Sequence, residues 1–253
     1  MERTRARQPA ALGGIVSDRM ARRPMMTTAR RRSELDGRRE AGFALAAYGA
    51  YLLVRRMVWN DSGRRRAADN TTRLVDAERR VGLHIEPRVQ QAALRFPRVV
   101  DIANAGYAAG NVALSVGWLM VMFHKGDAAY RDERRAAMIA FLGALPMFAI
   151  FPTAPPRTLD AFVDTLAERG FSLDHPRLIR FYNPIAAMPS HHVAFATVTG
   201  FGLASRASGK WRRRGWRGYP AAVALVVIAT GNHFVADVAG GAVLGAVARR
   251  LSR

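Results

Sequence analysis

Residues 183–204 read NPIAAMPSHHVAFATVTGFGLA, a polar entrance followed by a run of small and apolar side chains. Such a run, with glycine and alanine interspersed, is typical of a helix that packs closely against other helices inside a lipid bilayer. Two adjacent histidines, His191 and His192, stand at the start of the run. Polar groups at the membrane boundary cost free energy, and they usually serve function. The stretch therefore predicts a membrane helix whose entrance carries chemistry.

Five further segments share this apolar character with interspersed small residues. Several of the six are shorter than the roughly 20 residues that cross a bilayer, so they reach across only if their polar flanks lie inside the membrane boundary. We therefore expect an all-α fold, a polytopic bundle of six transmembrane helices. The pattern leaves one alternative, a soluble helical core with buried histidines. The predicted spans are residues 41–54, 99–123, 136–151, 193–205, 219–231 and 235–247.

Charge is separated from the apolar segments along the chain. The 253 residues carry a formal net charge of +20, although half of them are apolar. The positive-inside rule places both termini and the loops 124–135 and 206–217 in the cytoplasm, and the loops 152–190 and 231–236 outside. We therefore expect a multi-pass protein of the cell membrane whose active site lies on the extracytoplasmic face.

The basic segments that flank the spans have different expected structures. Residues 1–39 are rich in arginine and lack an apolar core, which predicts a disordered cytoplasmic tail ahead of one membrane-embedded domain at 40–253. No aromatic residue or motif accompanies this charge, so nucleic acid is not an expected partner. The stretch 55–98 has apolar residues at helical spacing and predicts amphipathic helices along the membrane interface. The chain has no cysteine, which excludes disulfides and a thiol nucleophile.

Polar residues of three kinds fall at the predicted outer ends of the spans. His233 precedes Asp237 by four residues, so the two share one face of a helix. A carboxylate there can accept from one imidazole nitrogen and leave the other free to act as a nucleophile or base. Arg157 follows the third span, and its guanidinium suits phosphate oxygens. His192 is the third candidate. Taken singly, these residues also fit a helix cap, a snorkelling arginine and a helical ion pair.

The order of these residues resembles a known family. Arg157, the motif Pro189-Ser190-x-His192 and the motif His233-x-x-x-Asp237 resemble the type 2 phosphatidic acid phosphatase superfamily. The stretches PTAPPR, YNPIAAMPSHH and TGNHFVADVAGG are similar to its branch of inositol phosphorylceramide synthases and their bacterial relatives, as is the interfacial stretch LVDAERRVGLHIEPRVQ. The resemblance covers roughly residues 40–250.

The resemblance implies phosphoryl transfer without a metal or other cofactor. His233 is expected to attack phosphorus and form a phosphohistidine, while Asp237 holds its ring. His192 is expected to protonate the leaving oxygen and later to activate the acceptor. Arg157 is expected to bind the phosphate.

Two positions depart from the pattern of the superfamily, and both remove a cation. Ile150 stands where the pattern has a lysine, and Val226-Val227 stands where it has a Ser-Arg pair. Fewer cations suit a phosphodiester, which brings one negative charge where a monoester brings about two, unless Arg177 and Arg180 substitute for them. His191 stands where relatives carry leucine or glycine, and it fits a second proton carrier, a hydrogen-bond donor to the phosphate or an exposed residue at a helix start. The expected substrate contacts are Arg157, Ser190, His191 and Arg180.

These expectations describe a membrane lipid phosphatase or phosphotransferase. Its partners are a lipid phosphate or phospholipid substrate and the bilayer, and hydrolysis stands level with transfer of an inositol-phosphate-type headgroup. One alternative is a zinc-dependent hydrolase with His191, His192, His233 and Asp237 as ligands, although adjacent histidines rarely point the same way on a helix. A transporter or channel is the other, and it would favour polar residues near mid-membrane. His84, His124 and His175 are expected to be solvated surface groups.

Overall fold

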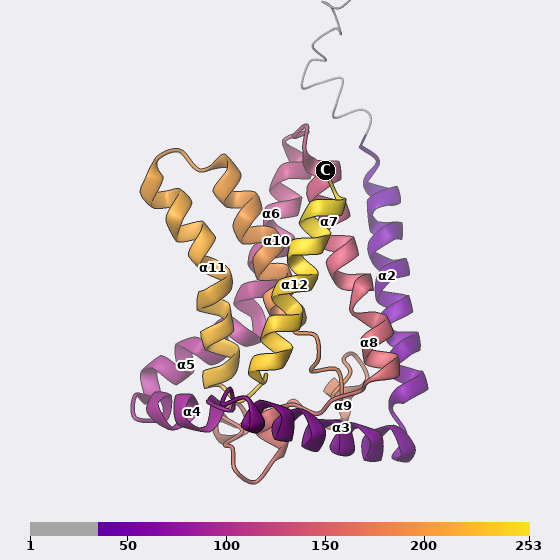
Figure 1. Ribbon diagram of the computed structural model, residues 1–253. Helices are drawn as coiled ribbons and strands as arrows, with labels where there is room; N and C mark the ends of the chain where they lie inside the picture. Colours follow the sequence, from indigo (N-terminus) through magenta and orange to yellow (C-terminus); the bar gives the residue numbers. More distant parts are fainter. Residues whose placement is uncertain (1–34) are drawn as a thin grey trace, which may run out of the picture.

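The computed structural model describes residues 35–253, and the regular structure of these residues is helical apart from one isolated β-bridge between Thr153 and Ala186. The predicted all-α fold is therefore confirmed. Seven helices in this part of the chain correspond to the six predicted spans, because two of them share the span 136–151, and they stand upright side by side in Figure 1. They are α2 (Gly37–Val58), α6 (Asn111–His124), α7 (Tyr130–Gly143), α8 (Leu145–Ile150), α10 (His191–Arg206), α11 (Lys210–Ala229) and α12 (Val235–Leu251).

A second set of helices lies across one end of this bundle. α3 (Asp61–Arg80) and α4 (Glu86–Leu94) run crosswise below the upright helices in Figure 1. They occupy the stretch that was predicted to form amphipathic helices. α5 (Pro97–Ala105) and the π-helical turn η1 (Gly106–Gly110) lead upward into α6. The loop between α8 and α10 carries only short elements, which are η2 (Pro156–Thr158), η3 (Ala167–Arg169) and α9 (Pro176–Ile179).

Helix α2 begins slightly before the first predicted span. Asp36 caps α2, accepting a 2.9 Å hydrogen bond from the N–H of Arg38, so the helix begins at Gly37, ahead of the predicted segment 41–54. A short acidic side chain is a favourable N-cap, because it accepts from a backbone N–H that has no partner within the helix. The rest of the predicted tail lies outside the described residues.

Length and composition alone support one membrane span among the described residues. The continuous helix Pro97–His124 is long and apolar enough to cross a bilayer. The other upright helices fall short for two physical reasons. α7 and α10 have 14 and 16 residues, whereas α2 and α11 are longer but carry arginines in their terminal turns. The six predicted spans are thus six upright helical segments, and only one of them among the described residues is long and apolar enough to cross a bilayer.

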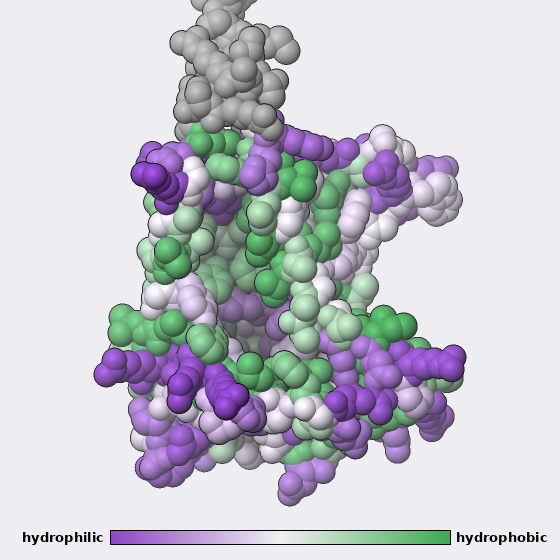
Figure 2. Space-filling view, turned by 180° about the vertical axis from the view of Figure 1, so that it is seen from behind, coloured by the Kyte–Doolittle hydropathy of each residue, from purple (hydrophilic) through white to green (hydrophobic). Residues whose placement is uncertain are grey.

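The outward surface of the upright helices is apolar. Leu45, Ile102, Ile150 and Val243 are between 64% and 75% exposed. Figure 2 shows apolar residues across the middle of one face, with hydrophilic residues gathered at both ends. Soluble monomers rarely expose continuous apolar surface on this scale.

Helix α10 lies at the centre of the bundle, where it contacts α6, α7, α11 and α12. Its seam with α12 is made by small residues. A Cβ atom added at Gly241 would lie 2.4 Å from the carbonyl oxygen of Ser190, and one at Gly245 would lie 2.7 Å from that of Ala194. Glycine is therefore required at both positions, because the two backbones are in direct contact. The seam fixes the start of α10 against the start of α12.

The two ends of the bundle differ in character. The start of α2, the α6–α7 and α10–α11 turns and the chain's C-terminus lie at one end, whereas α3, α4 and the α8–α10 loop lie at the other (Figure 1). The first end contains the basic loops 124–135 and 206–217. The second end contains the starts of α10 and α12, and with them the predicted catalytic histidines.

Candidate active site

The starts of α10 and α12 are tied together by Ser190. This residue is the N-cap of α10, and its Oγ accepts a 3.3 Å hydrogen bond from the N–H of Val193. Its own N–H donates to the carbonyl oxygen of Asp237 at 2.9 Å. Ser190 is fully buried and does not line the cavity described below. Ser190 was predicted as a substrate contact, but it holds the two motifs in register.

His233 is oriented by Asp237, but the two do not share a helical face as predicted, because α12 begins at Val235 and His233 precedes its N-cap residue Phe234. The Nδ1 atom of His233 lies 3.3 Å from Oδ2 of Asp237, and the same oxygen accepts from the N–H of Phe234 at 2.9 Å. Asp237 is fully buried and His233 is 5% exposed, so the pair is shielded from solvent. A carboxylate that accepts from Nδ1–H places the lone pair on Nε2. This arrangement makes Nε2 of His233 available as a nucleophile.

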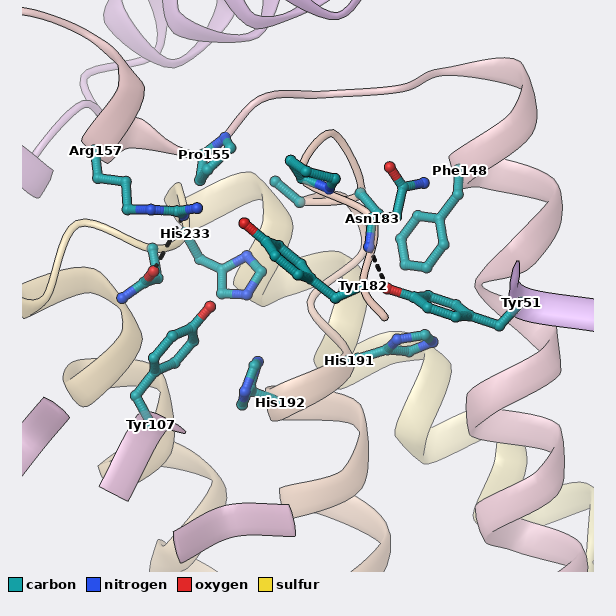
Figure 3. A pocket seen from close by; sticks show the side chains of 14 residues that line it. Tyr51, Tyr107, Phe148, Pro155, Arg157, Tyr182, Asn183, His191, His192 and His233 are labelled. Atoms are coloured by element: carbon teal, nitrogen blue, oxygen red, sulfur yellow. Dashed lines mark hydrogen bonds between the residues drawn. The ribbon is translucent and has the colours of Figure 1, made fainter. Parts of the chain in front are cut away.

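His192 faces the same space as His233. The centroids of the two imidazole rings are 5.8 Å apart, and the ring of His192 packs against Tyr107 at 4.4 Å. In Figure 3 the side chains of His192, His233 and Arg157 converge from three different segments. Two imidazoles and one guanidinium around one space are suited to a phosphate ester.

Arg157 is held in place by both its backbone and its side chain. Its N–H donates to the carbonyl oxygen of Gly231 at 2.7 Å, and its Nη1 donates to Oδ1 of Asn232 at 3.3 Å. Asp164 and Asp174 approach the guanidinium at 3.4 and 3.7 Å, longer than close ion-pair contacts. The Arg157 side chain is 3% exposed, so a cation with spare hydrogen-bonding capacity is kept inside the protein.

These groups line a cavity with a volume of about 170 Å³. Within the part of the chain that the structure describes, Arg157 is the only arginine or lysine in its lining. A second, mainly apolar groove of about 260 Å³ adjoins the cavity and shares Tyr107 and His192 with it. The cavity is lined by Tyr51, Tyr107, Phe148, Pro155, Arg157, Tyr182, Asn183, Pro184, Ala186, Ala187, His191, His192, Asn232 and His233.

His191 lines the cavity, but its ring is engaged elsewhere. Its Nε2 lies 3.0 Å from the carbonyl oxygen of Phe141, and its ring stacks on Phe141 with centroids 5.1 Å apart. The two adjacent histidines therefore point in different directions. His191 does not converge with His192, His233 and Asp237 on one point, so their geometry does not favour the alternative of a zinc site.

The predicted substitute cations do not reach the cavity. Arg177 and Arg180 lie in and just after α9, and both are exposed and absent from the cavity lining. Arg180 was predicted as a substrate contact, and the structure does not bring it to the other site residues. His124 and His175 are exposed, as predicted, whereas His84 is partly buried beside two glutamates, and its prediction as a solvated surface group is wrong.

Several polar residues of the cavity were missed by the sequence argument. Tyr107 lies in η1, and π-helical turns inside α-helices often mark functional sites, but no sequence pattern announces this one. Tyr182 and Asn183 belong to a stretch that carries the family resemblance, so a signal for them existed. Burial raises the pKa of Tyr182 despite the nearby Arg157, and its hydroxyl donates to the carbonyl oxygen of Leu173 at 2.8 Å.

Two glutamates support the start of α12 from below. Oε1 of Glu78 accepts from the N–H of Ala236, and Oε1 of Glu86 accepts from the N–H of Val235, both at 2.7 Å. Carboxylates are favourable partners for the unpaired N–H groups at a helix N-terminus. Burial, together with the neighbouring Glu86, raises the pKa of Glu78 to about 8 despite the bond from Ala236. The helix that carries Asp237 is therefore anchored to α3 and α4.

Comparison with known sequences identifies a family for most of the chain. A family model described as the PAP2 superfamily matches residues 72–251, a range that contains every residue predicted for the site. No curated protein and no solved structure shows significant similarity to the chain.

Proposed function

This chain belongs to the PAP2 superfamily, and from that premise we propose that it is an integral membrane enzyme that cleaves a lipid-linked phosphate ester through a phosphohistidine. The observation that carries the proposal is the convergence of His233, His192 and Arg157 on one cavity, with Asp237 behind His233. Phosphoester hydrolysis is the chemistry that membership of the superfamily suggests. The lipid substrate, the membrane setting and the fate of the phosphoryl group are inferred from the site.

The proposed reaction has two halves that balance in atoms and charge. In the first, Nε2 of His233 forms a bond to phosphorus, the ester P–O bond breaks, and the leaving oxygen takes a proton from His192. In the second, His192 takes a proton from water or an alcohol, whose oxygen bonds to phosphorus while the P–N bond breaks. Arg157 stabilises the charge on the phosphoryl oxygens in both halves. Asp237 holds the His233 ring and the tautomer that attack requires.

The charge of the cavity supports a phosphodiester as substrate. Arg157 is the one permanent cation in the described lining, and the exposed Arg177 and Arg180 do not supplement it. A diester brings one negative charge and a monoester about two, so a single guanidinium matches the diester better. Transfer of a phosphorylated headgroup to a lipid alcohol is then the favoured second half, with hydrolysis as the competing one.

The apolar groove beside the cavity supports a lipid as substrate. It runs between η1 and α11 and shares Tyr107 and His192 with the catalytic space. An acyl chain in this groove would hold its phosphate ester at the histidines. The exposed apolar residues of the upright helices, and the apolar middle of the face in Figure 2, support a position in the bilayer. We infer a multi-pass protein of the cell membrane with its site at the extracytoplasmic face.

A product assay tests the reaction. We expect the purified full-length chain in lipid vesicles to consume phosphatidylinositol carrying a labelled headgroup and to transfer the label to an added lipid alcohol. Phosphatidic acid, a monoester, is the comparison substrate, and His233→Ala is the matched background control. Labelled lipid product supports transfer, and labelled water-soluble inositol phosphate supports hydrolysis of the diester. Phosphate released from phosphatidic acid alone would refute the charge argument, and no product above the control would refute the proposed function.

A labelling experiment tests the orientation. The chain has no native cysteine, so single cysteines can be placed at the exposed positions Ser172 and Ser208. We expect a membrane-impermeant maleimide to label Ser172→Cys in intact cells, and Ser208→Cys only after the membrane is permeabilised. The opposite pattern would place the site at the cytoplasmic face.

A further inference from the structure

The side chains of Glu78, Glu86 and His84 surround a small space beneath α12. One ligand atom from each of these residues lies within 4.8 Å of the other two. In the described residues, no other group of three or more histidine and acidic side chains has this geometry. Nδ1 of His84 is 3.2 Å from Oε2 of Glu86 and 3.8 Å from Oε2 of Glu78. None of the three residues lines the catalytic cavity.

All three of these atoms are buried without a hydrogen-bond partner. They are Oε2 of Glu78, Nδ1 of His84 and Oε2 of Glu86. Glu86 is fully buried and Glu78 is 4% exposed. Buried polar atoms nearly always have a partner, so three orphaned atoms facing one another require an explanation.

The two carboxylates cannot turn away to find other donors. The second oxygen of each, Oε1, already accepts a 2.7 Å hydrogen bond from a backbone N–H at the start of α12. Rotating either side chain would break that bond and leave a helix N–H unpaired. The orphaned oxygens are therefore held toward His84 by the rest of the fold.

We propose that Glu78, His84 and Glu86 bind a divalent metal ion of the zinc and manganese class. One imidazole nitrogen and two carboxylate oxygens are a donor set that such ions accept, with remaining positions open to water. The charge of one divalent ion balances the two carboxylates, and the ion gives all three orphaned atoms a partner.

The ion has a positioning role in this arrangement. It fixes the two carboxylates that hold the N–H groups of Val235 and Ala236, and His233 lies directly before this helix start. The ion itself does not reach the phosphate. The inference goes beyond the proposed function and does not depend on it, because metal content can be measured without turnover.

Metal content is the direct test. The full-length chain in lipid nanodiscs is equilibrated with Zn²⁺, Mn²⁺ or Mg²⁺, dialysed, and analysed for metal per chain. We expect about one Zn²⁺ or Mn²⁺ per chain and little Mg²⁺, which is bound mainly through oxygen ligands and water. Glu86→Gln should lose the ion, because it removes one of the two carboxylate ligands. Its amide keeps an oxygen for the N–H of Val235 and can donate to the Glu78 carboxylate, so the start of α12 should stay in place. His84→Ala should also lose it.

Two control variants locate the ion. His175→Ala removes an exposed imidazole and should retain the metal, which excludes adventitious surface binding. His233→Ala should also retain it, because the site lies outside the catalytic cavity. Metal that is lost in His233→Ala but kept in Glu86→Gln would belong to the cavity and would overturn the assignment.

Thermal unfolding gives a second readout that needs no activity. With free Zn²⁺ at about 100 times its dissociation constant, we expect the Tm of the wild type to rise by roughly 5–10 °C. The Tm of Glu86→Gln should not respond, and the amide–carboxylate contact should keep that variant folded. A wild type that retains no metal and whose Tm ignores Zn²⁺ and Mn²⁺ would show that the carboxylates share a proton instead, which overturns the proposal.

Discussion

His233→Ala is expected to abolish turnover, with kcat falling by at least about 10⁴-fold, because the variant lacks the nitrogen that bonds to phosphorus. Since the ring of His233 borders a cavity and bonds only to Asp237 among the described contacts, removing it should leave the fold in place. Quenching the reaction of a headgroup-labelled substrate should trap an acid-labile, base-stable phosphohistidine in the wild type and none in the variant.

The control for this experiment is His175→Ala. His175 is an exposed histidine in the loop before α9, and its removal should leave kcat unchanged. If His233→Ala retained turnover within tenfold of the wild type, or if the label remained on the protein, the nucleophile would have to be another residue. Such a result would leave the metal assignment at Glu78, His84 and Glu86 untouched.

His192→Ala is expected to show the second largest effect, a fall in kcat of about 10²- to 10⁴-fold on a natural lipid ester. The reason is the loss of the proton that the leaving alkoxide needs. A substrate with an acidic leaving group, such as a nitrophenyl ester, needs no such proton. Its first step should therefore be slowed by less than about tenfold.

The same variant should accumulate the phosphohistidine when it is supplied with the nitrophenyl ester, because no base remains to activate the acceptor. A burst of nitrophenol equal to one per chain, followed by slow turnover, is the expected signature. An equal loss of rate on both substrates would contradict the acid–base role and would indicate that His192 acts mainly by packing against Tyr107.

The upright helices and the His233–Asp237 pair could be predicted because both depend on local pattern. Apolar runs defined the segments that became α2, α6, α10, α11 and α12. A spacing of four residues predicted that His233 and Asp237 meet, and their side chains are 3.3 Å apart, although His233 precedes the N-cap residue Phe234 and does not lie on α12 itself. These features need no knowledge of what lies elsewhere in the fold.

The features that the sequence did not predict depend on contacts between distant segments. Ser190 lies in the expected motif, but its N–H bonds to the carbonyl oxygen of Asp237 in another helix and its hydroxyl caps α10. It therefore does not line the cavity. Arg180 lies near the site in sequence, but the chain places it on the exposed end of α9. His84 has charged neighbours along the chain, which suggested a solvated residue. The fold turns the same neighbours inward, under α12.

The direct backbone contact between α10 and α12 has a mechanical consequence. Gly241 and Gly245 bring α12 against the backbone of α10, so the segments that carry His192 and His233 can neither slide nor separate without disrupting the core. The two segments therefore move as one rigid unit. A bulky lipid must therefore enter and leave the site without relative movement of these two segments.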